Sequence, residues 1–167
     1  MKIFPVPDVM KQSIYELTPR MFTNRGIRLL MLDIDNTVSP YTIHTPTPRM
    51  LAWVEQMKAA GLELYILSNN RGDRPEIFAA AFGLPYRKKA WKPFSKIARE
   101  VLAETGHTGA DTAFIGDQIY TDCACAVRCG AFSVVVHPIE FSNFWLRLRY
   151  WLEFPFRWRY LWKHTKK

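Results

Sequence analysis

The chain has 167 residues, of which 49% are hydrophobic and 14% aromatic, and its formal net charge is +8. This length suits one domain with a substantial core, and the apolar content excludes a disordered chain. Residues 141–167 contain seven Lys and Arg residues against one Glu, so this segment carries +6 and the rest of the chain only +2. A partner attracted by positive charge would therefore meet the C-terminal segment.

Cap, proline and glycine signals divide the rest of the chain into alternating strands and helices. Residues 1–17 are weakly patterned and predict an irregular arm with one short element near residues 13–17. We expect helices over 19–25, 48–60, 74–82, 93–105 and 119–129, and strands over 28–34, 62–67, 84–86, 112–116 and 131–136. Alternation with short connections predicts an α/β fold: a Rossmann-like three-layer sandwich around a mainly parallel five-stranded sheet.

Two acidic residues, Asp33 and Asp35, directly follow the apolar run of the strand predicted over 28–34. Residues spaced i, i+2 on a strand face the same side, so the two carboxylates are expected to lie together. Burial of two acids side by side is costly unless a cation or a proton offsets their repulsion. A lone pair of this kind is also explained by a charged exit from the strand.

Polar residues also follow the other strands of the predicted sheet: Ser68 and Asn69, Lys92, and Asp117. The carboxyl ends of parallel strands share one edge, where open α/β sheets bind ligands. Each group has a plainer alternative. Ser68 and Asn69 suit a turn, and Asp117 suits a helix N-cap. Lys92, with Lys88 and Lys89 close by, suits a solvated basic loop. Together Asp33, Asp35 and Asp117 would form an all-oxygen site, which favours Mg²⁺ over zinc.

In this order the motifs resemble the haloacid dehalogenase-like (HAD) phosphatase superfamily. Its first motif, D-x-D-x-T, is matched by Asp33-Ile34-Asp35-Asn36-Thr37; the others are matched by Ser68, by Lys92, and by Gly116-Asp117 with Asp122. The resemblance implies that Asp33 attacks phosphorus to form an aspartyl-phosphate and that Asp35 is the general acid and base. Lys92 would then be catalytic, and Ser68 and Asn69 would bind the phosphate.

The resemblance also implies a Mg²⁺ site formed by Asp33, the backbone carbonyl of Asp35, and Asp117, with Thr37 and Asp122 in support. Ser68 follows Asp33 by 35 positions and Lys92 follows Ser68 by 24, which leaves no room for a cap domain. An open site suits a large or surface-bound substrate. The motifs are most similar to the capless YqeG-type group of subfamily IIIA, which includes phosphatidylglycerophosphate phosphatases.

Residues 139–167 are predicted to form a basic aromatic extension of the phosphatase domain 1–138. The apolar residues at helical spacing and the flanking arginines are typical of an amphipathic helix in a lipid headgroup layer, whereas the charges argue against a transmembrane span. The residues predicted to face the membrane are Trp145, Arg147, Arg149, Trp151, Trp158 and Arg159. Two alternatives remain: helices packed on the sheet or on a second subunit, and a surface that binds RNA, the less favoured of the two.

The closely spaced Cys123, Cys125 and Cys129 suit a reducing compartment and buried helix positions better than a disulfide framework or a metal site. We therefore expect a cytoplasmic Mg²⁺-dependent phosphomonoesterase, peripheral on the inner face of the membrane, that acts on phosphatidylglycerophosphate. The alternatives are a soluble phosphatase for a sugar phosphate, nucleotide or phosphoprotein, and a non-catalytic binding protein. The sequence leaves open a homo-oligomer and the roles of Asn70, Arg71, Lys88 and Lys89.

Overall fold

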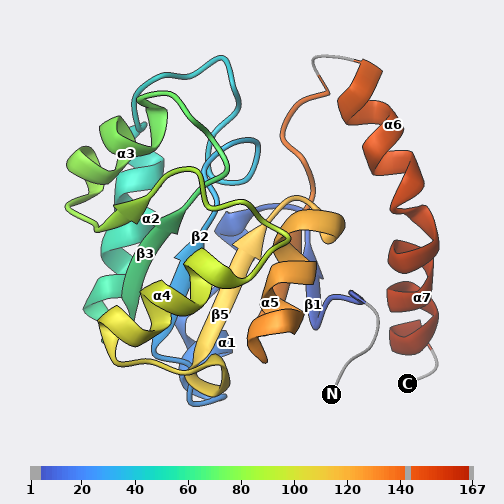
Figure 1. Cartoon of the computed structure of the whole chain (residues 1–167), viewed down its shortest axis with the longest axis horizontal. Coiled ribbons are helices and arrows are strands. Elements are labelled where there is room, and N and C mark those ends of the chain that lie inside the picture. The colour runs from blue at the N-terminus through green and yellow to red at the C-terminus, as the bar shows by residue number, and fades with distance from the viewer. Residues whose placement is uncertain (1–4, 142–143, 166–167) are drawn as a thin grey trace.

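The computed structural model describes residues 5–141 and 144–165, apart from the side chains of Trp145 and of residues 163–165. Its centre is a six-stranded sheet in the order β1-β6-β5-β2-β3-β4, in which every neighbouring pair is parallel (Figure 1). The strands are β1 (Val9–Lys11), β2 (Leu29–Leu32), β3 (Glu63–Leu67), β4 (Tyr86–Arg87), β5 (Thr112–Gly116) and β6 (Phe132–Val136).

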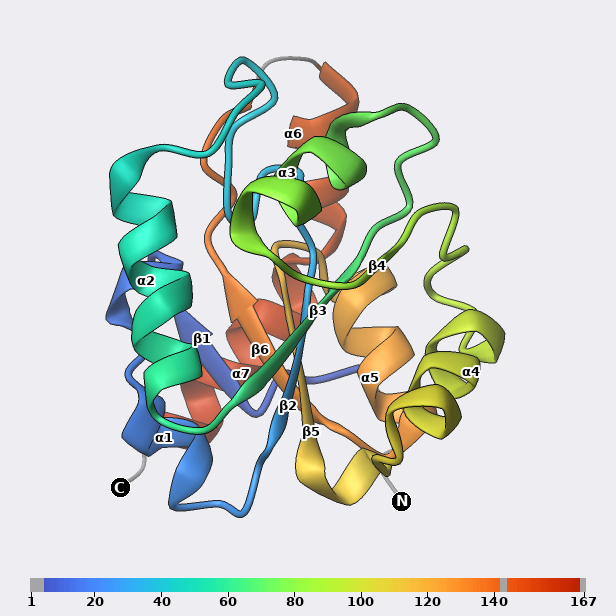
Figure 2. The ribbon, with the colours of Figure 1, turned by 90° about the vertical axis from the view of Figure 1, so that its left-hand side faces the viewer.

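Helices cover both faces of the sheet, which confirms the predicted three-layer α/β fold (Figure 2). One face packs on α1 (Pro19–Thr23), α2 (Pro48–Ala59) and α3 (Arg74–Phe82), and the other on α4 (Lys96–Thr105) and α5 (Ala124–Cys129). Single turns occur at Ile14–Glu16, at Gly109–Asp111 and, with π-helical bonding, at Ile119–Cys123. Within the described residues no cap domain interrupts this series of elements.

The predicted strand count was wrong by one, because the structure has a sixth strand, β1, inside the segment expected to be irregular. This strand has only three residues, all half-buried, and pairs along one edge with β6 alone. Its register is set by Asp8, whose carboxylate accepts hydrogen bonds from the backbone and the side chain of Ser133. A contact 125 residues apart in sequence leaves no local pattern to detect.

The helix bounds differ most from the prediction at α4 and α5, while α1 and α2 end two residues and one residue early. α4 begins at Lys96 instead of residue 93, because Lys92 and Pro93 form a turn that is closed by a hydrogen bond from the Phe94 N–H to the Trp91 oxygen. In the segment 119–129 the first turn is π-helical and α-helical bonding starts at Ala124. Both changes lie beside the strand ends and both alter where polar side chains point.

The C-terminal extension forms two consecutive helices, α6 (Phe144–Leu152) and α7 (Phe154–Thr165), that run along one side of the molecule (Figure 1). Pro155 falls in the first turn of α7, where a missing N–H costs nothing. Phe156 packs against the small cluster of Ile119, Cys123 and Val135. Neither helix, nor any other helix in the described ranges, has the length and apolarity that crossing a bilayer requires.

Candidate active site

The register of the central strands brings the predicted catalytic residues to one edge of the sheet. Leu32 pairs with Ile66 on one side and with Ile115 on the other, so β2, β3 and β5 end at nearly the same level. The residues that follow these ends are Asp33, Ser68 and Asp117, all buried. Lys92 reaches the same place from the loop after β4.

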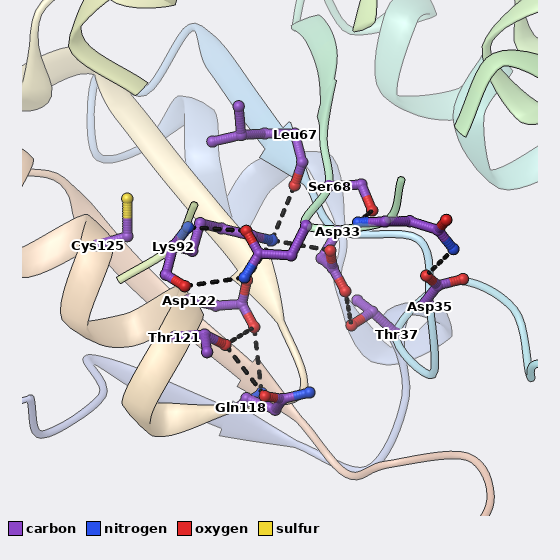
Figure 3. Close-up of polar contacts among 12 residues, drawn as sticks. Asp33, Asp35, Thr37, Leu67, Ser68, Lys92, Gln118, Thr121, Asp122 and Cys125 are labelled. Carbon is purple, nitrogen blue, oxygen red and sulfur yellow. Dashed lines mark hydrogen bonds and ion pairs between the residues drawn. The ribbon is translucent and has the colours of Figure 1, made fainter. Parts of the chain in front are cut away.

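Lys92 joins two buried carboxylates at the centre of the site (Figure 3). Its Nζ lies 2.8 Å from Asp33 Oδ1, 2.6 Å from Asp122 Oδ1 and 2.8 Å from the backbone oxygen of Leu67. These acceptors take all three donors of the ammonium group. Burial alone would lower the pKa of Lys92, but the charges of Asp122 and Asp33 outweigh it and raise that pKa, so Lys92 stays positively charged.

Asp33 carries a strongly shifted carboxyl group. Burial raises its pKa to about 7, Lys92 opposes the shift, and the negative charge of Asp122 adds to it. At Asp117 burial also raises the pKa, and Asp122 and Asp33 raise it further. Burial and mutual repulsion act together here: three buried acids share a single lysine, so negative charge is left without a counterion.

A divalent cation with oxygen ligands fits this imbalance. Asp33, Asp117 and Asp122 each offer a carboxylate oxygen, and these oxygens lie within 4.8 Å of one another. The hydroxyl of Thr37 lies 3.5 Å from Asp33 Oδ2 and 3.4 Å from Asp117 Oδ1, between two of the acids. The carboxylate cluster thus includes Asp122, for which the sequence predicted only a supporting role, and it does not include the carboxylate of Asp35.

The approach of Asp122 to the sheet requires the glycine at the end of β5. A Cβ placed on Gly116 would lie 2.2 Å from Asp122 Cγ, far inside contact distance. On its other side the Asp122 carboxylate accepts hydrogen bonds from the backbone N–H of Gln118, at 3.3 Å, and from the Thr121 hydroxyl, at 3.1 Å. The π-helical turn Ile119–Cys123 therefore aims Asp122 back at the strand end.

Asp35 lies beside Asp33 but its carboxylate turns toward α3 and the loop before it (Figure 3). Its Oδ2 accepts a 2.7 Å hydrogen bond from Asn70, and its Oδ1 lies 2.7 Å from Arg74 Nε. Arg74 also donates to the backbone oxygens of Pro40 and Ile43 and so ties the loop after β2 to α3. Apart from its place at a helix start, nothing in the sequence pattern indicates this role of Arg74.

The two predicted phosphate-binding residues differ in what holds them. The Ser68 hydroxyl accepts a hydrogen bond from the backbone N–H of Asn70 at 3.1 Å, and Ser68 lines the same cavity as Asp33 and Lys92. The Asn69 side chain donates to the backbone oxygen of Lys92 at 2.8 Å and accepts from its N–H at 2.7 Å. Asn69 therefore holds the Lys92 loop, and its second amide N–H and its backbone remain for a phosphate.

These residues line an open cavity of about 540 Å³. The same cavity is also lined by a second group of residues, namely Tyr41, Gln118, Tyr120, Thr121 and Arg149. Burial raises the pKa of Tyr41 and the negative charge of Asp117 adds to the shift, so its phenol remains a hydrogen-bond donor at neutral pH. The sequence did not predict this second group, because its members are scattered over loops, a turn and α6.

Arg149 was predicted to face a membrane, and the structure places its guanidinium at the cavity. Arg149 Nη1 donates a 2.7 Å hydrogen bond to Gln118 Oε1. Trp151 and Trp158 are 70% and 60% exposed, and Arg147 and Arg159 are exposed as well. The side chain of Trp145 lies outside the described part of the chain.

A buried ion pair attaches the extension to the loop that carries Asp117. Glu153 Oε1 accepts hydrogen bonds from the backbone N–H groups of Ile119, at 2.7 Å, and Tyr120, at 3.2 Å. Glu153 Oε2 lies 2.9 Å from Arg157 Nη2, which also donates to the backbone oxygen of Asp117 at 3.1 Å. A sequence pattern consistent with this pair exists but did not lead to its prediction: Glu153 is the one acid of the basic segment 141–167, and it lies four residues before Arg157.

Among the residues whose role the sequence left open, Asn70 is part of the site and the others lie outside the cavity. Asn70 donates a hydrogen bond to Asp35 and lines the cavity. Lys88 lies 4.0 Å from Asp73 and 3.6 Å from Glu76, and Arg71 stacks over Trp91 with 4.9 Å between its guanidinium carbon and the ring centre. Cys123 and Cys125 are buried within the protein, and Cys129 is half-buried.

Residues 7–130 match the family described as "Hydrolase: haloacid dehalogenase-like hydrolase". The chain belongs to the haloacid dehalogenase-like hydrolase family. This membership agrees with the order of motifs around Asp33 and with the capless fold. The YqeG-type resemblance is confirmed by the Bacillus subtilis protein named "Probable phosphatase YqeG", which is 32% identical over 143 residues that cover 86% of this chain and 83% of that protein. The predicted enzyme class, a phosphatase of the HAD type, is confirmed with it.

Solved structures share the fold at low identity. A hypothetical protein of Xanthomonas campestris has a TM-score of 0.55 and 15% identity, with 81% of this chain and 74% of that chain covered. The cobalt-bound deoxy-D-mannose-octulosonate 8-phosphate phosphatase of Haemophilus influenzae has a TM-score of 0.52 and 15% identity, with 68% and 80% covered. At this identity the likeness concerns the HAD fold.

Proposed function

We propose that this HAD hydrolase is a Mg²⁺-dependent phosphomonoesterase in which Asp33 is the nucleophile. The observation that carries the proposal is the Asp33 carboxylate, buried at the bottom of the cavity and oriented by Lys92. An Asp33 oxygen attacks phosphorus, the bond from phosphorus to the leaving oxygen breaks, and Asp35 donates a proton to that oxygen. In the second step water attacks the aspartyl-phosphate, Asp35 takes the water's proton, and phosphate leaves.

The other polar residues of the cavity each have a role in these two steps. Lys92 and Ser68 lie where they can bind oxygens of the transferred phosphoryl group, and Lys92 offsets the charge that develops there. Asn70 and Arg74 orient the Asp35 carboxylate through the contacts at 2.7 Å. Asn69 holds the backbone of Lys92 in place.

Mg²⁺ would be held by Asp33, Asp117 and the backbone carbonyl of Asp35, with Asp122 beside them. The donor set supports this choice, since it consists of oxygens alone and contains a buried negative charge in excess. When bound, the ion screens the charge on the phosphoryl group. Thr37 would keep the two carboxylates apart at the spacing that the ion requires.

The proposed substrate is phosphatidylglycerophosphate, cleaved at the surface of an anionic membrane on the cytoplasmic side. Two observations support a lipid substrate: the cavity has no cap over it in the described residues, and the outer side of α6 and α7 presents aromatic side chains among arginines. The exposed apolar residues there are Trp151, Leu152, Phe154, Trp158, Leu161 and Trp162. Such a surface is suited to the headgroup layer.

The test is phosphate release from phosphatidylglycerophosphate in mixed micelles with Mg²⁺, with Asp33→Asn as the blank. We expect turnover that disappears in the variant and exceeds the turnover of soluble phosphate esters. Cleavage of soluble esters alone would support the phosphatase activity and contradict the lipid substrate. Absence of Mg²⁺-dependent turnover on every ester would favour a binding protein that keeps the fold without the chemistry.

A further inference from the structure

The cavity is larger than a phosphoryl group needs, and its lining contains more than the reacting residues. Asp33, Ser68 and Lys92 line it where the proposed reaction takes place. The lining also includes a cation from the extension, Arg149, and the phenols of Tyr41 and Tyr120. None of the three residues has a part in the proposed attack at phosphorus, so their presence at the cavity calls for another explanation.

One hydrogen bond orients the Arg149 guanidinium and leaves most of its N–H donors available. Its Nη1 donates to Gln118 Oε1 at 2.7 Å, and Gln118 directly follows Asp117 in the loop that the acidic cluster shares. Among the described residues (5–141 and 144–165, without the side chains of residues 145 and 163–165), no carboxylate lies within 4 Å of the Arg149 guanidinium. A guanidinium has five N–H donors, so most of them remain for a ligand in the cavity.

Arg149 is one of several contacts between the extension and the domain. The attachment also has buried contacts, in which Glu153 binds the backbone of residues 119 and 120 and Arg157 binds the backbone of Asp117. Phe156 adds an edge-on contact with the ring of Tyr120, with 5.5 Å between centroids. Arg149 adds one hydrogen bond to these contacts, and its remaining N–H groups are available to a molecule in the cavity.

We propose that Arg149 is a substrate-binding residue that recognises a second anionic group, of the phosphodiester class, on the molecule whose phosphomonoester reacts at Asp33. The planar guanidinium binds two oxygens of such a group at once, which a lysine cannot do. Tyr41 lines the same cavity and remains a hydrogen-bond donor at neutral pH. The inference rests on the proposed phosphatase function and adds to it a residue from the extension that selects the substrate.

A matched pair of variants tests this role in the full-length protein with Mg²⁺. Arg149→Gln removes the cation at the cavity, while Arg147→Gln removes the same charge from the same helix but not from the cavity lining. Three substrates are compared: p-nitrophenyl phosphate, the water-soluble deacylated headgroup glycerophosphoglycerophosphate, and micellar phosphatidylglycerophosphate. The readout is kcat/KM on each phosphodiester-bearing substrate divided by kcat/KM on the aryl phosphate, with thermal melting as a check on folding.

We expect Arg149→Gln to lower this ratio about 10- to 100-fold for both the headgroup and the lipid, the range for a lost hydrogen bond to a charged group. The ratio in Arg147→Gln should stay near that of the wild type for the headgroup. An equal loss on the aryl phosphate in Arg149→Gln would overturn the inference, because Arg149 would then act on the catalytic loop through Gln118. So would a ratio that does not change.

The same data separate this inference from the proposed lipid substrate. If the protein cleaves the headgroup in a way that depends on Arg149 but does not cleave the lipid, the inference is supported and the proposed lipid substrate is contradicted. Cleavage of the lipid with no selective effect of Arg149→Gln would do the reverse. If the wild type cleaves only the aryl phosphate, both are wrong.

Discussion

The edge of the sheet and the C-terminal extension are both part of the site, but they reach it in different ways. At the sheet edge the residues are placed by strand register, and Asp33, Ser68 and Asp117 each follow directly after a buried strand. The extension reaches the same loop through contacts that span more than 30 residues, such as Glu153 with Ile119. Local sequence therefore encodes the first region, while the second depends on tertiary packing.

The comparison predicts that a single methyl group at the sheet edge has the largest effect. Gly116→Ala would place a carbon 2.2 Å from Asp122 Cγ and must displace that carboxylate, together with the lysine bound to it. Misplacement of this size should lower kcat/KM by at least about 10²-fold. The measurement is steady-state hydrolysis of an aryl phosphate.

Gly130→Ala is the matched control for that change. Gly130 has a φ of +71° and no atom within 4 Å of the added carbon, so it tests backbone strain alone. Strain of this kind costs about 1–2 kcal/mol of stability and should leave turnover intact. Equal loss of activity in the two variants would mean that the close approach of Asp122 is not what the site requires.

Loss of the buried ion pair should be the next largest effect. Arg157→Met leaves the Glu153 carboxylate buried without its partner, which costs about 3 kcal/mol. For a protein of this size the melting temperature should fall by about 6–12 °C. Arg147→Met, an exposed arginine on α6, serves as the control and should lower the melting temperature far less. A similar small shift in both variants would mean that the extension is only loosely attached.

Metal binding should depend on pH in the direction set by the two raised acids. Without metal the pKa of Asp33 is raised to about 7 and that of Asp117 is raised as well, so protons occupy the site at lower pH. A cation must displace them, so its affinity should rise by at least about tenfold per pH unit below pH 7, and by up to about a hundredfold where both acids hold a proton. Isothermal titration with Mg²⁺ between pH 5.5 and 8 measures this slope. A flat profile would contradict the burial of an excess negative charge.

The smallest effect is expected on the outer side of the extension. Trp158 is 60% exposed, and its insertion into a headgroup layer would remove apolar area from water. Trp158→Ala should therefore weaken binding to anionic vesicles by about tenfold. Ile77→Ala removes another exposed apolar side chain, on α3, and should leave vesicle binding unchanged. If the two variants bind alike, the membrane is not the partner of this surface.

The sequence predicted the sheet edge well because its signals are short. An apolar run followed by Asp33 and Asp35, and a glycine before Asp117, each lie within a few residues, and parallel pairing then brings them together. What the sequence could not supply were the contacts between distant segments: the partners of Asp35, the way Asn69 holds Lys92, and the pairing of β1 with β6.

The extension was harder to predict because one helix can serve two surfaces. Helical spacing predicted an amphipathic helix, and Arg147, Arg149 and Arg159 were all expected to face the membrane, while Arg157 had no predicted role. The structure divides them: Arg157 is buried against the loop of Asp117, Arg149 reaches the cavity, and Arg159 is exposed. Periodicity shows which residues share a face of a helix but not what that face contacts.

The central claim, that Asp33 forms the bond to phosphorus, can be tested on the residue itself. The protein is mixed with a phosphate ester and Mg²⁺, quenched within the first turnovers and treated with borohydride, which reduces an acyl phosphate to an alcohol. Peptide mass spectrometry should then find homoserine in place of Asp33 and unmodified aspartate at positions 35, 117 and 122. Homoserine at any of the other three positions, or turnover with no reduced aspartate, would contradict the account.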